Sequence, residues 1–217
     1  MLYISRSHLL AILCTGLVLA TGCGKDQDVT TPEPEPEKPF PVTVDSLLTL
    51  FRTAHEEMDI STYSEFLHDG FKFFLKEEDV LGMGLSFDHL DHDADITCMT
   101  HIFSGEHYLR QDGNTVAGVS EVYFRPLDQH SPWAPSEHPD FLGTQVALFE
   151  VDLGFHRPGD TTIVITGVAE FYVTSRDSLY HGESVQFWQI RGVVDRTDSN
   201  GKVVGGISWG GFKVLYY

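Results

Sequence analysis

The chain has 217 residues, of which 41% are hydrophobic, and its 32 acidic residues outnumber its 14 basic residues to give a formal net charge of −18. This balance excludes proteins that bind nucleic acid through basic patches, because such binding depends on Lys and Arg displacing the counterions of phosphates. The length is sufficient to bury one sizeable hydrophobic core.

The first 22 residues have the layout of a secretory signal peptide. Arg6 is the only formally charged side chain among them, and an apolar run over 9–20 is followed by small residues. The run is too short to cross a bilayer as a helix, which takes about 20 apolar residues. An ordinary buried helix is the alternative, but nothing amphipathic follows the run, and the next residues are rich in Pro and acidic residues. We therefore expect residues 1–22 to be removed on export.

The sequence "ATGC" at 20–23 resembles the lipobox of bacterial lipoprotein precursors, which implies cleavage before Cys23 and lipidation of that residue. Gly24 in the next position resembles outer-membrane rather than inner-membrane sorting. An unmodified Cys23 after an ordinary signal is the alternative. Residues 23–42 then form a disordered Pro/Glu-rich tether, and the lipid anchors the protein in the bacterial cell envelope, facing the periplasm or the cell surface. Cys14 leaves with the signal, so Cys98 alone remains and no internal disulfide can form.

The folded part begins with helical patterns. A helix is expected through 46–58, capped by Thr43 or Asp45, because Leu47, Leu48, Phe51 and Ala54 share one stripe. A second helix over 62–69, capped by Ser61, and a strand over 71–77 follow. A third helix is expected over 86–103.

After Gly105 the hydrophobic pattern changes to period two, which is typical of strands. Five strands are expected, over 116–127, 144–156, 161–173, 183–195 and 207–217. Turn residues at 112–114, 158–160 and 200–201 separate several of them. Helices followed by a long antiparallel meander predict a single α+β domain over 43–217, with the helices on one face of the sheet.

Three stretches carry a resemblance to a known superfamily. Residues 47–74, "FWQIRGVVD" and "SWGGFKVLYY" resemble nuclear transport factor 2-like (SnoaL-like) domains, and in particular those of uncharacterised bacterial lipoproteins. The resemblance implies a strongly bent antiparallel sheet wrapped around helices as a cone. In the isomerases, dehydratases and cyclases of this superfamily, the open end holds a small apolar substrate and a carboxylate or histidine transfers protons. Other members are non-catalytic dimers or accessory domains, so a homodimer is among the implied states.

The segment "FDHLDHDADITCMTHIF" at 87–103 concentrates histidines and aspartates. On one helix, an apolar stripe would hold Phe87, Leu90, Ala94, Cys98, His101 and Ile102. His89 and His92 fall outside this stripe, which indicates a solvated face. A zinc site on a helix needs its histidines on one face and further ligands converging from elsewhere. We therefore expect no metal and no other cofactor, with a weak metal site at His89 and His92 as the alternative.

His101 lies in the apolar stripe and has two interpretations. It is either a neutral histidine bonded to a backbone carbonyl or a general acid/base. In the second case a strand supplies its orienting group, with Tyr123 or Glu121 as candidates. Asp91, at the edge of the stripe, is either a residue favoured by the helix dipole or a cavity carboxylate.

Two tryptophans and several strand carboxylates complete the candidates. Trp188 and Trp209 are expected to pack in the core or to line a cavity, and Glu121 can lie on either face. Glu150 and Glu170 alternate with packed residues, so both should point outward. The loop over 127–141 carries His130 and His138 and is long enough to be a lid or a partner-binding loop.

No paired carboxylates, nucleophile elbow, phosphate loop or thiol pair is recognisable in the sequence. The expected function is therefore a lipid-anchored domain that binds a small apolar ligand or a protein without chemistry of its own. The alternative is a small cofactor-free isomerase, dehydratase or cyclase that uses His101 with Asp91 or Tyr123.

Overall fold

The computed structural model describes residues 40–159, 162–196 and 207–217. The expected signal peptide, Cys23, the tether up to residue 39 and the turn at 200–201 lie outside the described residues. Lys38–Tyr217 forms one compact unit.

The first helix agrees with the expectation from the sequence. α1 (Val44–Glu56) begins after Thr43, whose hydroxyl accepts from the backbone N–H of Ser46 at 3.1 Å. The side chain of Ser46 in turn accepts from the backbone N–H of Thr43, which completes a capping box. The predicted stripe is buried, including Phe51 at 1% exposure.

The second helix starts earlier than expected. α2 (Ile60–Glu65) is capped by Asp59, not by Ser61, because the Asp59 carboxylate accepts from the backbone N–H of Thr62 at 3.1 Å. The helix also ends earlier than predicted, at Glu65. β1 (Leu67–Phe74) accordingly begins four residues before the predicted strand.

The histidine-rich segment is not a single helix. Its start forms β2 (His89–Asp91), which pairs antiparallel with the end of β1, and α4 (His92–Phe103) begins only after Asp91. The Asp91 carboxylate caps α4 by accepting from Ala94 N at 3.0 Å. Edge pairing thus overrides the helical periodicity of residues 87–91. A further helix, α3 (Glu77–Met83), was not expected and buries none of its residues.

The large sheet has the strand order β2-β1-β10-β9-β8-β5, in which β1 and β10 are parallel and the other neighbouring strands are antiparallel. The strands of this order not yet described are the short β5 (Glu121–Phe124) and the long β8 (Gln145–His156), β9 (Ile163–Tyr180) and β10 (Glu183–Arg196). The loop over 127–141 adds β6 (Asp128–Gln129), β7 (Ala134–Pro135) and the short helix η1 (Pro139–Phe141) against this sheet, and β3 (Tyr108–Leu109) pairs with β4 (Thr115–Val116).

The C-terminal segment overturns one expectation. Residues 209–214 form the helix α5 (Trp209–Val214), not part of the final strand expected over 207–217. Ser208 caps it by accepting from Gly211 N at 3.0 Å. All six residues of α5 are buried. Burial on every side removes the periodicity on which a sequence-based distinction between strand and helix depends.

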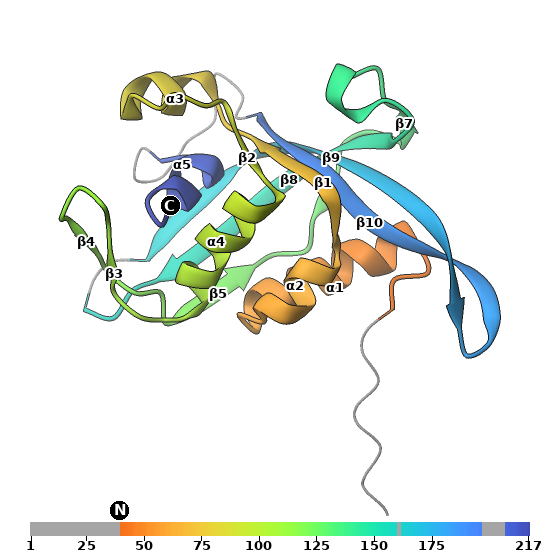
Figure 1. Ribbon diagram of the computed structural model, residues 1–217, viewed down its shortest axis with the longest axis horizontal. Coiled ribbons are helices and arrows are strands. Elements are labelled where there is room, and N and C mark those ends of the chain that lie inside the picture. Colours follow the sequence, from red (N-terminus) through yellow and green to blue (C-terminus); the bar gives the residue numbers. More distant parts are fainter. Residues whose placement is uncertain (1–39, 160–161, 197–206) are drawn as a thin grey trace, which may run out of the picture. The chain divides into compact units, whose positions relative to one another are not determined.

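The fold class is confirmed as α+β. Figure 1 shows α1, α2, α4 and α5 on one side of the strongly bent sheet, with the β9–β10 hairpin extending beyond them. The face of the sheet toward these helices is called the inner face and the opposite one the outer face. Ala147, Phe149, Val151 and Leu153 are buried on the inner face, so Glu150 points outward as expected. Among the described residues, no helix is both long and apolar enough to span a bilayer.

Candidate functional site

Three polar side chains meet between the helices and the inner face of the sheet. The Nζ atom of Lys213 on α5 lies 2.5 Å from Oδ1 of Asp95 on α4, and their side chains are 1% and 0% exposed. Tyr63 on α2 donates to Oδ2 of Asp95 at 2.6 Å and accepts from Lys213 at 3.2 Å. Each of these three groups therefore hydrogen-bonds to the other two. Buried charges require such partners.

Aromatic rings surround this group, which we call the interior triad (Tyr63, Asp95 and Lys213). The Lys213 ammonium lies 4.4 Å from the ring centroid of Phe73 and 5.4 Å from that of Trp209, which adds cation–π attraction. Burial and the Asp95 carboxylate raise the pKa of Tyr63 well above its usual 10.0, so its hydroxyl remains a donor.

His55 on α1 is a second buried titratable group. Its Nδ1 donates to the carbonyl oxygen of Phe51 at 2.9 Å, and its Nε2 has no hydrogen-bond partner among the described residues. Burial is the main cause that lowers the pKa of His55 from 6.5 to about 3. The imidazole is therefore neutral, and it packs edge-on against Tyr63 and Phe124 with ring centroids 5.1 and 5.2 Å away.

α5 is held in place by carboxylates at its first turn. The Ser208 hydroxyl donates to Asp79 on α3, and the backbone N–H of Gly210 donates to Asp195 on β10 at 3.3 Å. Asp195 is only 8% exposed, and burial raises its pKa from 3.8 to about 6. These contacts fix the helix between β10 and α3.

The interior is consequently filled. Trp209 packs on Phe73 and Phe124 at 5.2 and 5.8 Å, and Phe212 stacks on Phe155 at 4.0 Å. His55 and all members of the interior triad have 0% exposure. The space in which the resemblance implies a ligand cavity holds core side chains, so no substrate reaches these titratable groups in this conformation.

The outer face of the sheet instead carries a pocket of about 600 Å³. Leu148 on β8, Val168 on β9 and Val194 on β10 contribute apolar surface from neighbouring strands. The rim is charged, and there Arg196 pairs with Glu170 at 2.9 Å. We call this the outer pocket; its full lining is Leu75, Lys76, Glu77, Glu78, Leu148, Val168, Glu170, Val194, Asp195 and Arg196.

The proposed catalytic residues lie far apart. His101, in the last turn of α4, is bonded through Nδ1 to the carbonyl oxygen of Tyr216 at 2.8 Å and stacks on Tyr108. Asp91 caps the opposite end of the same helix, about 15 Å away at 1.5 Å per residue. Tyr123 belongs to β5, where its hydroxyl donates to Asp152 at 2.7 Å. The structure does not bring these three side chains together.

The remaining candidates are also dispersed. Glu121 is exposed on β5, Trp188 is half-buried on β10, and Trp209 lies in the interior on α5. His89 and His92 each hydrogen-bond the carboxylate of a sequence neighbour, at 2.7 and 3.0 Å. No described group of potential metal ligands includes either histidine.

The sequence-based interpretation missed the interior triad. Asp95 lies on the same face of α4 as Cys98, Met99 and Ile102, all fully buried. If the helix had been predicted to begin at residue 92, its apolar stripe would have included Asp95, three residues before Cys98, and so indicated a buried carboxylate. Lys213 was hidden because residues 207–217 were expected to form a strand.

Searches against protein-family models and curated proteins return no match. Solved structures with similar coordinates include a candidate aromatic ring hydroxylase from Novosphingobium aromaticivorans, at 13% identity over 71% of this chain and 85% of that chain, with a TM-score of 0.44. An NTF2-like protein of unknown function from Exiguobacterium matches at 12% identity over 71% and 99%, with a TM-score of 0.39. An LEH-like epoxide hydrolase from M. tuberculosis matches at 14% over 73% and 86%, with a TM-score of 0.37. Likeness at this level bears on neither activity nor ligand.

Proposed function

We propose that the protein is a lipid-anchored binding domain of the bacterial cell envelope that performs no reaction of its own. The observation that carries this proposal is the filled interior. The titratable residues His55, Tyr63, Asp95 and Lys213 lie between the sheet and the helices, and each has 0% exposure. General acid–base catalysis requires such a group within hydrogen-bond reach of the substrate, and this interior leaves no room for one.

The outer pocket supports a binding role. Its volume of about 600 Å³ falls in the range of small-molecule sites, roughly 300–1,000 Å³. Apolar side chains from β8, β9 and β10 would contact the body of a ligand, and the charged rim would orient its polar end. Because both Glu170 and Arg196 are on this rim, it offers a hydrogen-bond acceptor beside a donor.

The anchor is the second part of the proposal, and it rests on the lipobox resemblance at Cys23. The first described residues are fixed to the β9–β10 hairpin: Phe40 stacks on Tyr180 at 4.6 Å, and Trp188 N donates to the Pro41 carbonyl at 3.0 Å. The tether would therefore reach the domain at this hairpin. Mass spectrometry of the mature amino terminus should find a lipid on Cys23, and Cys23→Ser should release a folded protein from membranes. An unmodified terminus at another residue would refute the anchor.

The binding site can be tested by a fragment screen observed through methyl NMR signals of the full chain in detergent. We expect hits to shift the methyl signals of Leu148, Val168 and Val194 and to leave those of Ile102 and Ile190 in place. Val168→Phe should fill the outer pocket and abolish these shifts. Val164→Phe is the matched control, because Val164 is another partly exposed valine of β9 that does not line the pocket.

Binding inside the fold would contradict the proposal. Hits that shift Ile102 and Ile190, that persist in Val168→Phe and that are chemically converted would support the isomerase, dehydratase or cyclase instead. In that event His101→Phe should abolish the conversion. On the binding interpretation, His101→Phe removes one half-exposed hydrogen bond to Tyr216 and costs about 1 kcal/mol.

A further inference from the structure

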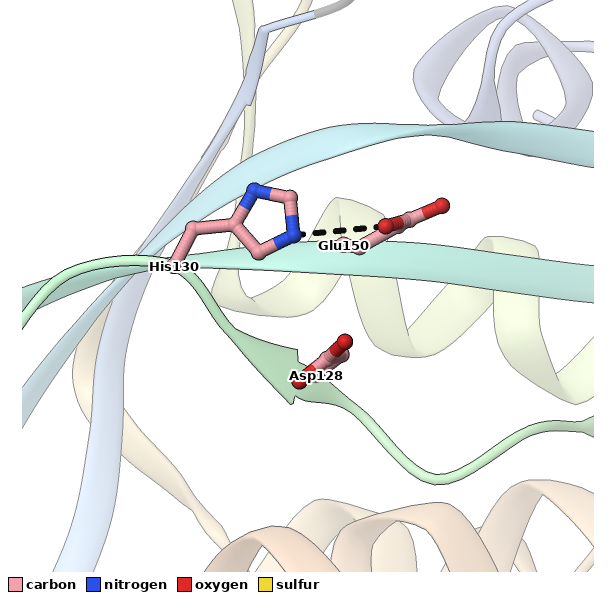
Figure 2. Close-up of side chains that lie close together, drawn as sticks. All are labelled: Asp128, His130 and Glu150. Atoms are coloured by element: carbon pink, nitrogen blue, oxygen red, sulfur yellow. Dashed lines mark ion pairs between the residues drawn. The ribbon is translucent and has the colours of Figure 1, made fainter.

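Two carboxylates and one imidazole converge on the outer face beside the outer pocket. One potential ligand atom from each of Asp128, His130 and Glu150 lies within 4.8 Å of the other two. Figure 2 shows the His130 ring directed at the Glu150 carboxylate, with Asp128 on the adjacent strand β6. The Nε2 atom of His130 is 3.2 Å from Oε2 of Glu150.

The backbone fixes the relative positions of the three residues. Asp128 on β6 is the direct cross-strand partner of Glu150 on β8. One step further along, His130 N donates to the Leu148 carbonyl at 2.8 Å, and Leu148 N donates to the Ser131 hydroxyl at 2.9 Å. Since Asp128 and His130 are two residues apart in an extended segment, their side chains share one face. The donor set is therefore built on paired strands.

The two carboxylates at this position lack the basic partner that two other carboxylates of the sheet have. Asp152 on β8 pairs with Arg125 at 3.2 Å, and Glu170 on β9 pairs with Arg196 at 2.9 Å. Within the described ranges, neither Asp128 nor Glu150 has a Lys or Arg partner. Like charges directly opposite each other on neighbouring strands are destabilising. A divalent cation between the two carboxylates would remove this repulsion.

We propose that Asp128, His130 and Glu150 bind one divalent transition-metal ion, with Zn²⁺ as the representative. Zn²⁺ binds imidazole nitrogen and carboxylate oxygen at about 2.0–2.2 Å, and tetrahedral ligand atoms are then about 3.4 Å apart. The present ligand atoms lie within 4.8 Å of one another, so binding requires these exposed side chains to rotate until the separations shorten by up to about 1.4 Å. Three protein ligands leave a coordination position for solvent or for an anionic group of a ligand. The site differs from the expectation of no metal, and its ligands are not His89 and His92.

Isothermal titration of the full chain with Zn²⁺ tests the site, provided that the protein carries no histidine tag. We expect saturable binding of one ion per chain and proton release on binding. Asp128→Asn, His130→Asn and Glu150→Gln should each weaken binding at least about tenfold. All three residues are exposed, so no variant should be destabilised in the absence of metal, and Asp128→Asn and Glu150→Gln should melt at or slightly above the wild-type temperature because they remove the repulsion between the carboxylates. Co²⁺ should give absorption bands that the His130→Asn variant lacks.

His89→Asn/His92→Asn is the matched control, since it removes two other histidines that lie beside carboxylates. This double variant should bind Zn²⁺ as the wild type does. Three results would overturn the proposal: loss of binding in the double variant, unchanged affinity in His130→Asn, or weak non-saturating uptake shared among the histidines. The proposal is independent of the outer pocket, because metal binding is measured without any other ligand.

Discussion

Asp95→Asn removes the negative charge of the interior triad and leaves the Lys213 ammonium without an anionic partner. The Lys213 side chain is 1% exposed, and its remaining polar contact is the Tyr63 hydroxyl at 3.2 Å. Breaking a buried ion pair by removing one partner costs about 3–5 kcal/mol of unfolding free energy. In a domain of this size, each kcal/mol shifts the melting temperature by about 2–4 °C, so the expected decrease is about 6–20 °C.

The matched reference is the triple variant Asp95→Leu, Lys213→Met and Tyr63→Phe, which replaces the interior triad with apolar side chains of similar size. The variant removes all three polar groups of the triad together and leaves none of them without its partner, so its unfolding free energy should lie within about 2 kcal/mol of the wild type, or above it. Urea unfolding followed by tryptophan fluorescence measures all of these variants. A cost below about 1 kcal/mol for Asp95→Asn would refute the burial of the pair. A triple variant as unstable as the single one would refute the claim that the penalty comes from the unpaired charge.

Two predictions concern pH and one concerns packing. Because the folded pKa of Asp195 is raised to about 6, the contribution of Asp195 to stability should fall as the pH rises from 3.8 through 6. Asp195→Asn should be up to about 3 kcal/mol more stable than the wild type at pH 8 and similar near pH 4, as urea titrations at both pH values can check. The pKa of His55 is lowered to about 3, so its contribution has the opposite slope and should be lost as the pH falls from 6.5 toward 3. His55→Phe should reduce this loss of stability at acidic pH. If calorimetric scans show the same loss in the variant, His55 is excluded as its cause. A Cβ at Gly192 would lie 2.1 Å from the Phe141 ring, so Gly192→Ala should cost about 1–3 kcal/mol and expose η1 to protease. Gly82→Ala, which meets no atom within 4 Å, is the control and should not destabilise.

Local hydrophobic patterns were sufficient to predict a helix or strand wherever one face of that element is buried and the other is solvated. The stripe of α1 and the alternation of β8 were predicted to the level of individual side chains, because each element has one wet face that makes its period visible. The same reasoning failed for α5, whose residues are all buried, and for β2, which forms because β1 offers it an edge. Neither cause is contained in the segment itself.

The candidate sites depended on tertiary structure to a greater degree. His101 could be identified as a histidine with a carbonyl partner, but that partner belongs to Tyr216, which is 115 positions away. The interior triad joins α2, α4 and α5, and Asp128 meets Glu150 only through the register of β6 on β8. Such pairings depend on long-range contacts. These contacts do not change the hydrophobic periodicity of either segment, so the sequence pattern does not reveal them.

The sequence by itself determined the acidic charge, the α+β class and the inward or outward direction of most strand residues. These properties follow from composition and from local alternation, which each segment carries without its neighbours. Only the tertiary structure decided that the interior is filled rather than hollow. That outcome depends on where α5 docks, and its docking is fixed by Asp79, Asp95 and Asp195 on three other elements.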